Sequence, residues 1–240
     1  MAYQNVFKRY ELKYILTSEQ KEKLLEAMKP HMQLDKYGRT TIRNLYFDTD
    51  NYLLIRRSIE KPEYKEKLRI RSYSLAKADS TVFVELKKKY RSVVYKRRIS
   101  LTEQEAIQWV ANEHHCRKKT QISDEIDYFI NFYKTLRPTV FLSYEREAYY
   151  SKDKSDFRVT FDDNILFRQK DLSLECEAYG TPLLDDNLVL MEIKCSGGIP
   201  LWMTEFLSEN RIFKTSFSKY GTAYRNHIFP QLHHTAAHNN

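Results

Sequence analysis

The chain is poor in the residues that cross-link or interrupt a fold. Among its 240 residues are 3 Cys, 5 Gly and 6 Pro. Cys116, Cys176 and Cys195 include no CxxC spacing, and three thiols cannot all pair, which disfavours a disulfide framework or a zinc site. So few glycines and prolines disfavour long linkers. We therefore expect one domain over residues 1–230, followed by a polar tail at 231–240.

Long apolar runs are also missing. No run approaches the roughly 20 residues needed to span a bilayer, and the first residues lack the apolar segment of a signal peptide. We therefore expect a cytoplasmic protein without a membrane segment of its own, and leave a separate membrane partner open. Hydrophobic residues make up 42% of the chain and aromatic residues 14%, which predicts a packed core.

Charge, in contrast, is abundant and unevenly placed. The formal net charge is +8. Between Lys61 and Arg98, 13 Lys and Arg stand against 4 Asp and Glu, a surplus of +9, so the rest of the chain is close to neutral. A concentrated basic block indicates an anionic partner.

The charged residues alternate with apolar ones in strand-like segments. Successive strand side chains point to opposite faces, so Arg9, Glu11 and Lys13 share a face. The same alternation places these residues together on their strands: Lys65, Lys67, Arg69 and Arg71; Glu85 and Lys87; Lys96 and Arg98; Arg158, Thr160 and Asp162; Glu192 and Lys194. In one strand this pattern is typical of a solvated outer face. Six such strands favour a shared polar interior.

Helices and strands are predicted from periodicity and capping signals. Strands are expected near residues 6–16, 40–48, 64–73, 81–89, 92–101, 138–149, 157–162 and 187–195, and helices at Ser18–Met28, Thr102–Cys116, Ser123–Thr135 and Leu201–Asn210. Thr102 and Glu105 form a T-x-x-E capping box. If the amphipathic helices cover the apolar outside of a closed sheet, its charged face lines a water-filled lumen. The prediction is an α+β fold with an eight-stranded antiparallel β-barrel tunnel and helices packed outside.

Several motifs then resemble a known family. They are E-x-K at Glu11–Lys13, LRIR at 68–71, FVELK at 83–87, YKRR at 95–98, YERE at 144–147, FRVTFD at 157–162, LMEIK at 190–194 and SKY at 218–220. In this order, from about Phe7 to Tyr224, they resemble the VTC (vacuolar transporter chaperone) polyphosphate polymerase domain of the triphosphate tunnel metalloenzymes, also called the CYTH superfamily. The resemblance rests on the ordered combination of these motifs.

The resemblance implies an enzyme that transfers the γ-phosphate of ATP to inorganic polyphosphate, with Mn²⁺ or Mg²⁺ as cofactor. Carried over by motif and strand position, the implied catalytic residues are Lys13, Arg69, Arg71, Lys87, Arg146 and Lys219. The implied substrate-binding residues are Arg9, Lys96, Arg158 and Lys194, to which the strand alternation adds Lys67 and Arg98. The implied metal ligand is Glu192, and Glu11 and Glu85 are further candidate ligands because hard divalent cations bind carboxylates. The superfamily's usual E-x-E-x-K has Arg9 in place of its first Glu, which disfavours a two-metal hydrolytic site and favours the polymerase branch.

Other interpretations stay open at this stage. Glu11 and Glu85 have ion pairing with neighbouring lysines as an alternative to metal binding, and Asp48 has turn capping. Lys67 fits either the lumen or the tunnel mouth. A nucleic-acid-binding module would interleave aromatic and basic residues on one face, whereas Arg69 and Arg71 are expected to stand together without rings; we therefore expect no nucleic-acid partner. A triphosphate hydrolase, a cyclase and a non-catalytic polyphosphate-binding module remain alternatives.

Overall fold

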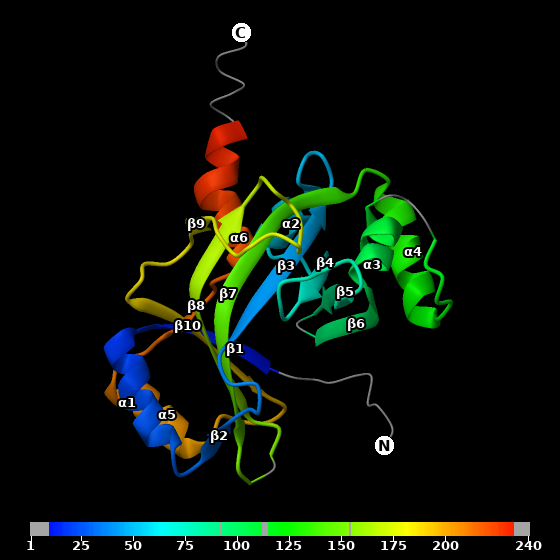
Figure 1. Ribbon diagram of the computed structural model, residues 1–240. Coiled ribbons are helices and arrows are strands. Elements are labelled where there is room, and N and C mark those ends of the chain that lie inside the picture. Colours follow the sequence, from blue (N-terminus) through cyan, green and yellow to red (C-terminus); the bar gives the residue numbers. More distant parts are fainter. Residues whose placement is uncertain (1–9, 92, 112–114, 154, 233–240) are drawn as a thin grey trace. The chain divides into compact units, whose positions relative to one another are not determined.

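The computed structural model describes residues 10–91, 93–111, 115–153 and 155–232 (Figure 1). In these residues the chain forms eleven strands, six α-helices and one π-helical turn. The strands are β1 (Tyr10–Thr17), β2 (Met32–Leu34), β3 (Thr40–Asp48), β4 (Tyr64–Ser72), β5 (Thr81–Tyr90), β6 (Val93–Thr102), β7 (Arg137–Ser151), β8 (Arg158–Arg168), β9 (Thr181–Pro182), β10 (Leu188–Cys195) and β11 (Lys214–Thr215). The helices are α1 (Ser18–Met28), α2 (Leu53–Ile59), α3 (Glu103–Val110), α4 (Gln121–Tyr133), α5 (Leu201–Glu209), α6 (Lys219–Ala223) and the π-helix η1 (Tyr224–Ile228).

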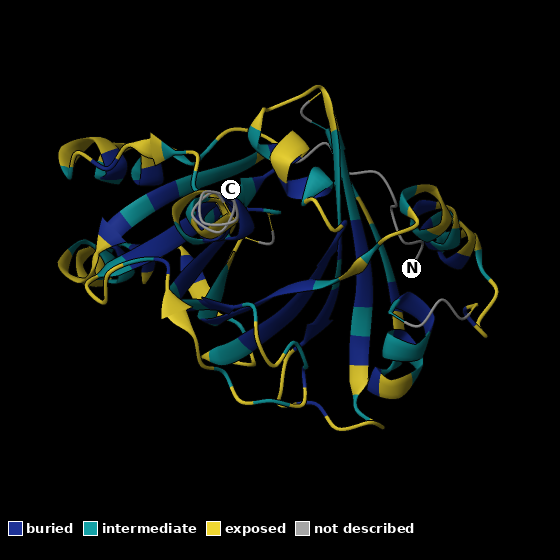
Figure 2. Cartoon of the chain, turned by 90° about the horizontal axis from the view of Figure 1, so that it is seen from above, coloured by how far each residue is buried: buried dark blue, intermediate teal, exposed yellow. Residues whose placement is uncertain are grey.

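The chain divides into two compact units. Unit 1 comprises Met1–Thr41, Tyr144–Ile165 and Leu184–Phe217, and unit 2 comprises Ile42–Ser143, Leu166–Leu183 and Ser218–Asn240. Strands β3, β7 and β8 contribute residues to both units. Each unit places one apolar sheet face against helices, and the strands carry most of the buried residues (Figure 2).

In unit 1 the strand order is β11-β1-β10-β8-β7, with β2 paired to β7. Alternate apolar side chains of β1, β8 and β10 form a core with α1 and α5. Leu16 on β1, Leu24 on α1 and Met203 on α5 are fully buried there. Thr17 caps α1 through a capping box with Gln20, which fixes where the strand ends and the helix begins.

In unit 2 the strand order is β7-β3-β4-β5-β6, with β9 paired to β8. Leu68, Ile70, Val84 and Leu86 alternate along β4 and β5, and all four are fully buried. They join a core to which α3 contributes Trp109 and α4 contributes Phe129, among others. Since strand side chains alternate, the charged residues between these apolar positions lie on the opposite face of the sheet.

The predicted elements largely agree with this structure, but the closed eight-stranded barrel does not. All eight predicted strands and four predicted helices are present, and the Thr102–Glu105 capping box is confirmed. Strands β2, β9 and β11 have only two or three residues, too short for a period-two pattern to reveal them. The hydrogen-bonded order has β11 and β6 at its ends, and no pairing between these two strands occurs among the described residues.

Candidate functional site

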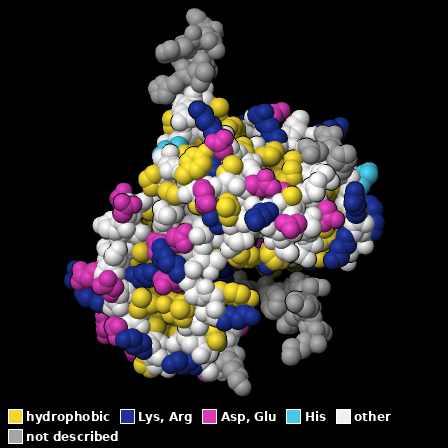
Figure 3. Space-filling view, in the orientation of Figure 1, with side chains coloured by type: hydrophobic (Ala, Val, Ile, Leu, Met, Phe, Trp, Pro, Cys, Tyr) yellow, Lys and Arg dark blue, Asp and Glu magenta, His cyan; other side chains and the backbone are white. Residues whose placement is uncertain are grey.

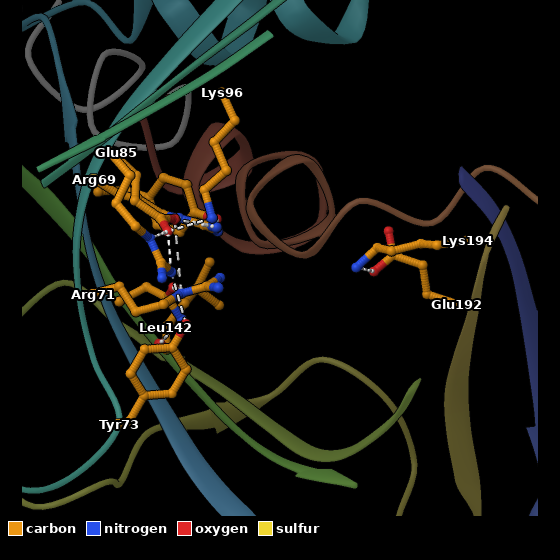
Figure 4. Close-up of polar contacts among 11 residues, drawn as sticks. Arg69, Arg71, Tyr73, Glu85, Lys96, Leu142, Glu192 and Lys194 are labelled. Atoms are coloured by element: carbon orange, nitrogen blue, oxygen red, sulfur yellow. Dashed lines mark hydrogen bonds and ion pairs between the residues drawn. The ribbon is translucent and has the colours of Figure 1, made fainter. Parts of the chain in front are cut away.

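A buried carboxylate surrounded by cations lies at the centre of the polar face of unit 2. Glu85 on β5 is 1% exposed. Its Oε2 lies 2.8 Å from Arg69 Nε, and its Oε1 lies 2.6 Å from Lys96 Nζ. Arg98 Nε donates to Oε1 at 2.7 Å, and Arg71 Nε lies 3.9 Å from Oε2. Figure 4 shows Arg69, Arg71 and Lys96 directed toward Glu85.

The sheet register explains why these residues meet. Arg69 on β4 pairs with Glu85 on β5, and Glu85 pairs with Arg98 on β6. Side chains directly opposite one another in an antiparallel sheet lie on the same face, about 5 Å apart at Cβ. Lys67, Lys87 and Lys96 form the next row of the same lattice. The predicted residues of β4, β5 and β6 therefore share one face.

Aromatic rings contact all three arginines of this face, contrary to the prediction that the basic face lacks rings. Tyr46 on β3 accepts a hydrogen bond from Arg69 at 2.8 Å. Tyr73 accepts one from Arg98 at 2.7 Å, and the Arg98 guanidinium lies 4.3 Å from the Phe83 ring centre. The sequence pattern of β4 alone could not show this, since the rings come from adjacent strands and from the residue after β4.

Arg71 is held by an amide, and its guanidinium also lies 6.0 Å from the Tyr73 ring centre. Asn44 on β3 is fully buried, accepts a hydrogen bond from Arg71 Nε at 2.9 Å, and donates one to the Leu142 carbonyl at 3.1 Å. Asn44 is opposite Arg71 in the β3–β4 register. These contacts hold the guanidinium in one position, and preorganisation of this kind lowers the entropic cost of binding in general.

The electrostatics of this group, which we call the Glu85 cluster (Glu85, Arg69, Arg71, Lys96 and Arg98), favour an additional anion. Burial opposes ionisation of Glu85, but the surrounding cations outweigh it and hold the pKa of this carboxyl well below its usual range. Burial lowers the pKa of Lys96 to about 8, although Glu85 opposes the shift. One carboxylate thus faces four cations, so the cluster carries a surplus of positive charge.

Unit 1 carries a second polar face. Arg146 on β7 and Asp162 on β8 form a two-pronged ion pair with distances of 2.6 and 2.7 Å, and Asp162 is fully buried. The Arg146 guanidinium also lies 5.0 Å from the Tyr144 ring centre. Despite its burial, interactions with Tyr144, Asp162 and Glu192 raise the pKa of Arg146 well above its usual value. Arg146 therefore stays charged.

Glu192 and Lys194 lie on the same unit 1 face, on β10. Their side chains form an ion pair at 3.2 Å (Figure 4). Lys13 on β1 is opposite Glu192 in the sheet register, and its Nζ donates to the Phe217 carbonyl at 2.9 Å. Glu11 is opposite Lys194, while Lys194 is opposite Arg158 on β8. The predicted basic and acidic residues of β1, β8 and β10 thus occur in adjacent rows.

The oxygen atoms near Glu192 that could ligate a metal suit a divalent cation only when a phosphate supplies further ligands. Glu192 is opposite Thr160, whose Oγ1 is buried without a hydrogen-bond partner. Among residues whose placement is described, no group of three or more His, Cys, Asp and Glu side chains has a metal-binding arrangement. Mg²⁺ is commonly bound by one or two carboxylates plus substrate phosphates, and Glu192 suits that mode. Glu85 has cations at both of its carboxylate oxygens.

Asp48 has a capping role, one of its two predicted alternatives. Its carboxylate is fully buried and accepts hydrogen bonds from the backbone N–H groups of Thr49, Leu54 and Ile55 at 2.8 to 3.0 Å. It also accepts one from the Tyr220 hydroxyl at 2.9 Å. Tyr220 follows Lys219, the first residue of α6.

Some residues of the site lie beyond what strand patterns revealed. Arg9, predicted to bind substrate, is outside the described residues.

Tyr46, Asn44 and Tyr73 are residues of the site that the sequence did not predict. Tyr46 and Asn44 show one signal that could have placed them on the same face of the sheet, since they occupy alternate positions of β3. Their partners on β4 could be assigned only once the register was known.

The charges outside the two polar faces are mixed. On the face shown in Figure 3, basic and acidic side chains are interspersed among the coloured residues. Arg97, on the opposite face of β6 from Arg98, pairs with Glu125 on α4 at 2.9 Å.

In the part of the chain that the structure describes, no helix has the length and apolar character required to traverse a membrane.

Comparisons with known proteins agree with the motif pattern. The sequence matches the VTC domain family over residues 8–227. No curated protein sequence matches the chain. A candidate adenylate cyclase from Bacillus halodurans has a similar structure, with a TM-score of 0.54 at 15% identity, covering 89% of this chain and 94% of that one. A candidate adenylyl cyclase from Hippeastrum has a TM-score of 0.52 at 18% identity, covering 90% and 94%. At these identities the likeness concerns the fold alone.

Proposed function

Because this chain belongs to the VTC domain family, we propose that it is a polyphosphate polymerase, which transfers the γ-phosphate of ATP to inorganic polyphosphate and releases ADP. The observation that carries the proposal is the Glu85 cluster, in which one buried carboxylate organises Arg69, Arg71, Lys96 and Arg98 on one sheet face. Arginine pairs with phosphate oxygens in a two-pronged geometry. A fixed group of three arginines and a lysine suits the adjacent phosphates of a triphosphate.

The reaction requires little covalent chemistry from the protein. Phosphoryl transfer is accelerated mainly by positioning the reactants and by neutralising charge on the transferred group. A terminal oxygen of the polyphosphate is already anionic, so it attacks the γ-phosphorus without a general base. A new P–O bond forms as the bond to the β,γ-bridging oxygen breaks, and ADP leaves with that electron pair.

Glu85 acts in this proposal as the internal counter-ion that keeps the cations together before the substrate arrives. Arg69, Arg71, Lys96 and Arg98 bind phosphate oxygens, and Lys67 and Lys87 extend the basic face by one row. Lys219 at the start of α6 is a further phosphate-binding residue. Each cation stabilises the transition state by neutralising negative charge that develops on the transferred phosphoryl group.

The polar face of unit 1 is proposed to bind phosphate through Lys13, Arg146, Arg158 and Lys194. Glu192, with Glu11 nearby in register, is the proposed ligand of Mn²⁺ or Mg²⁺. When bound, such an ion neutralises phosphate charge and orients the oxygens that it contacts. Asp162 keeps Arg146 in place through their two-pronged ion pair.

The proposal is tested by incubating the purified protein with ATP and Mn²⁺ and resolving the products. We expect ADP together with a ladder of long polyphosphate, and a short polyphosphate primer should remove any initial lag. Rising salt should slow the reaction by screening the charges of the site. Cyclic AMP with pyrophosphate would assign the protein to the cyclases, and tight polyphosphate binding without turnover would make it a binding module.

A triphosphatase is the second candidate. The Hippeastrum protein of similar fold is described as having a dominant triphosphatase activity, and the same cationic cluster would serve attack by water. Orthophosphate as the only phosphate product would favour this candidate. Arg9 in place of the first Glu of the superfamily's usual E-x-E-x-K supports the polymerase, since a two-metal hydrolytic site needs the additional carboxylate.

A further inference from the structure

Tyr220 connects the short helix α6 to two residues of β3. Its side chain is buried, with 3% exposure, and its hydroxyl donates to Asp48 at 2.9 Å. Its ring centre lies 5.2 Å from that of Tyr46, whose hydroxyl accepts from Arg69 at 2.8 Å. One side chain thus contacts both Asp48, the last residue of β3, and the Tyr46 ring on the same strand, whose hydroxyl holds Arg69 of the Glu85 cluster.

The Asp48 end of this connection is firmly anchored. The backbone N–H groups of Thr49 and, in the first turn of α2, of Leu54 and Ile55 donate to the Asp48 carboxylate, and Tyr220 supplies a fourth donor. Burial, together with Asp48, raises the pKa of the Tyr220 hydroxyl well above its usual value, so the hydroxyl stays protonated as a donor. Buried polar groups of this kind are costly to leave unpaired, which favours one position for the ring.

The sequence around Tyr220 keeps α6 close to its surroundings. The Ser218 hydroxyl accepts a hydrogen bond from the Gly221 backbone N–H at 3.3 Å and caps the helix. A Cβ atom at Gly221 would lie 3.1 Å from Ser218 Oγ, so glycine permits this tight start. The helix has only five residues before η1 begins, so its own backbone hydrogen bonds constrain it little.

We propose that Tyr220 is a positioning residue that fixes Lys219 relative to the Glu85 cluster by anchoring α6 to Asp48 and Tyr46. This inference rests on the proposed function, in which Lys219 binds phosphate. Lys219 immediately precedes Tyr220, so an anchor on Tyr220 restricts the path of the backbone that carries the lysine. In a five-residue helix, tertiary contacts of this kind determine the position of the first turn.

The test is a double-mutant cycle measured by direct binding of tripolyphosphate to the full chain. Lys219→Ala should weaken binding about 10-fold or more, the usual effect of losing a charged hydrogen bond. Tyr220→Phe keeps the ring against Tyr46 but removes the hydroxyl, and it should weaken binding about 5-fold. In the Lys219→Ala background, Tyr220→Phe should have almost no further effect, because its influence passes through Lys219.

A matched control is available one helical turn later. Tyr224 is also buried, with 5% exposure, and its ring packs against Tyr52. Tyr224→Phe should leave tripolyphosphate affinity unchanged, and thermal unfolding of both Phe variants reports any loss of folding. If Tyr220→Phe does not fold, the same cycle is made with Asp48→Asn, which removes an acceptor from the same hydrogen-bond group.

The outcomes separate the inference from the proposed function. Wild-type protein that binds no tripolyphosphate would overturn the proposed function, and the inference with it. Wild-type binding combined with additive effects of the two substitutions would overturn the inference alone. An unchanged affinity in Lys219→Ala would also overturn the inference, because the lysine would then have no phosphate to bind.

Discussion

Arg69 and Glu85 lie directly opposite each other on β4 and β5, and Arg69 Nη2 is 2.7 Å from the buried Glu85 carboxylate. The Glu85 carboxylate also interacts with Arg71, Lys96 and Arg98, so its single negative charge cannot neutralise all four cations. In the Glu85 cluster the negative charge of Glu85 attracts the four cations, while the cations repel one another and destabilise the arrangement. Its stability should therefore depend on whatever anion is present.

The first prediction is that Glu85→Gln makes folding dependent on added phosphate. Removing one partner of a buried ion pair typically costs about 3–5 kcal/mol, because the other charge is left uncompensated. We expect a fall in the free energy of unfolding of about that size in low-salt buffer. Tripolyphosphate should then stabilise the variant more than it stabilises the wild type, as measured by thermal unfolding with and without the ligand.

Glu66→Gln is the matched control for this experiment. Glu66 is a neighbouring glutamate on β4 that accepts hydrogen bonds from Tyr64 and Tyr133 instead of arginines. Its substitution should not increase the stabilisation by tripolyphosphate. An equal ligand effect in Glu85→Gln and wild type would show that the Glu85 charge does not compete with phosphate for the cations, and would contradict the prediction.

The second prediction separates the two faces of the sheet. Arg69→Ala or Arg71→Ala should weaken tripolyphosphate binding by about 1.5–3 kcal/mol, the usual contribution of a hydrogen bond to a charged group. Arg97→Ala removes the same charge from the opposite face, where Arg97 pairs with Glu125, and affinity should change little. Titration calorimetry of the three variants gives the comparison. Equal losses in all three would indicate non-specific attraction to the net charge.

Much of the fold was predictable because its signals are local. The alternation of Leu68, Arg69, Ile70 and Arg71 identified β4 and both of its faces, and Thr102 with Glu105 marked the start of α3. Helices α2 and α6 were not predicted. They have only seven and five residues, so they contain too few turns to show a 3.6-residue period.

The site was predictable to a lesser degree, because its contacts depend on register. Strand alternation placed Arg98 and Glu85 on polar faces, but it could not show that they pair across β5 and β6. Tyr46 and Asn44 support the arginines from β3, which is more than 20 residues away in sequence from its partners on β4. Such contacts arise from tertiary pairing and leave no local pattern.

The third prediction concerns the metal. Glu192→Gln keeps the size of the side chain but removes the charge that would bind a divalent cation and that now pairs with Lys194. We expect loss of polyphosphate synthesis and a weaker dependence on Mn²⁺, while ATP still binds. The measurement is product formation across a Mn²⁺ titration, beside direct ATP binding.

Glu147→Gln provides the comparison within unit 1. Glu147 on β7 pairs with Lys21 on α1 at 2.5 Å, so its substitution removes a carboxylate from another ion pair. Synthesis by this variant should keep the wild-type dependence on Mn²⁺. Full activity of Glu192→Gln at the Mn²⁺ concentrations that saturate the wild type would show that Glu192 forms an ion pair with Lys194 and does not bind the metal.

The last prediction follows from the pKa of Lys96, which burial lowers to about 8. Below pH 8 the ammonium group is charged and attracts phosphate, and above pH 8 the free protein loses this charge. Bound phosphate favours the charged form, so binding should take up a proton near pH 8 and affinity should fall as the pH rises further. Lys96→Arg keeps its charge throughout this range. We therefore expect the ratio of wild-type to Lys96→Arg affinity for tripolyphosphate to decrease between pH 7 and 9.5, and a constant ratio would show that Lys96 does not contact the ligand.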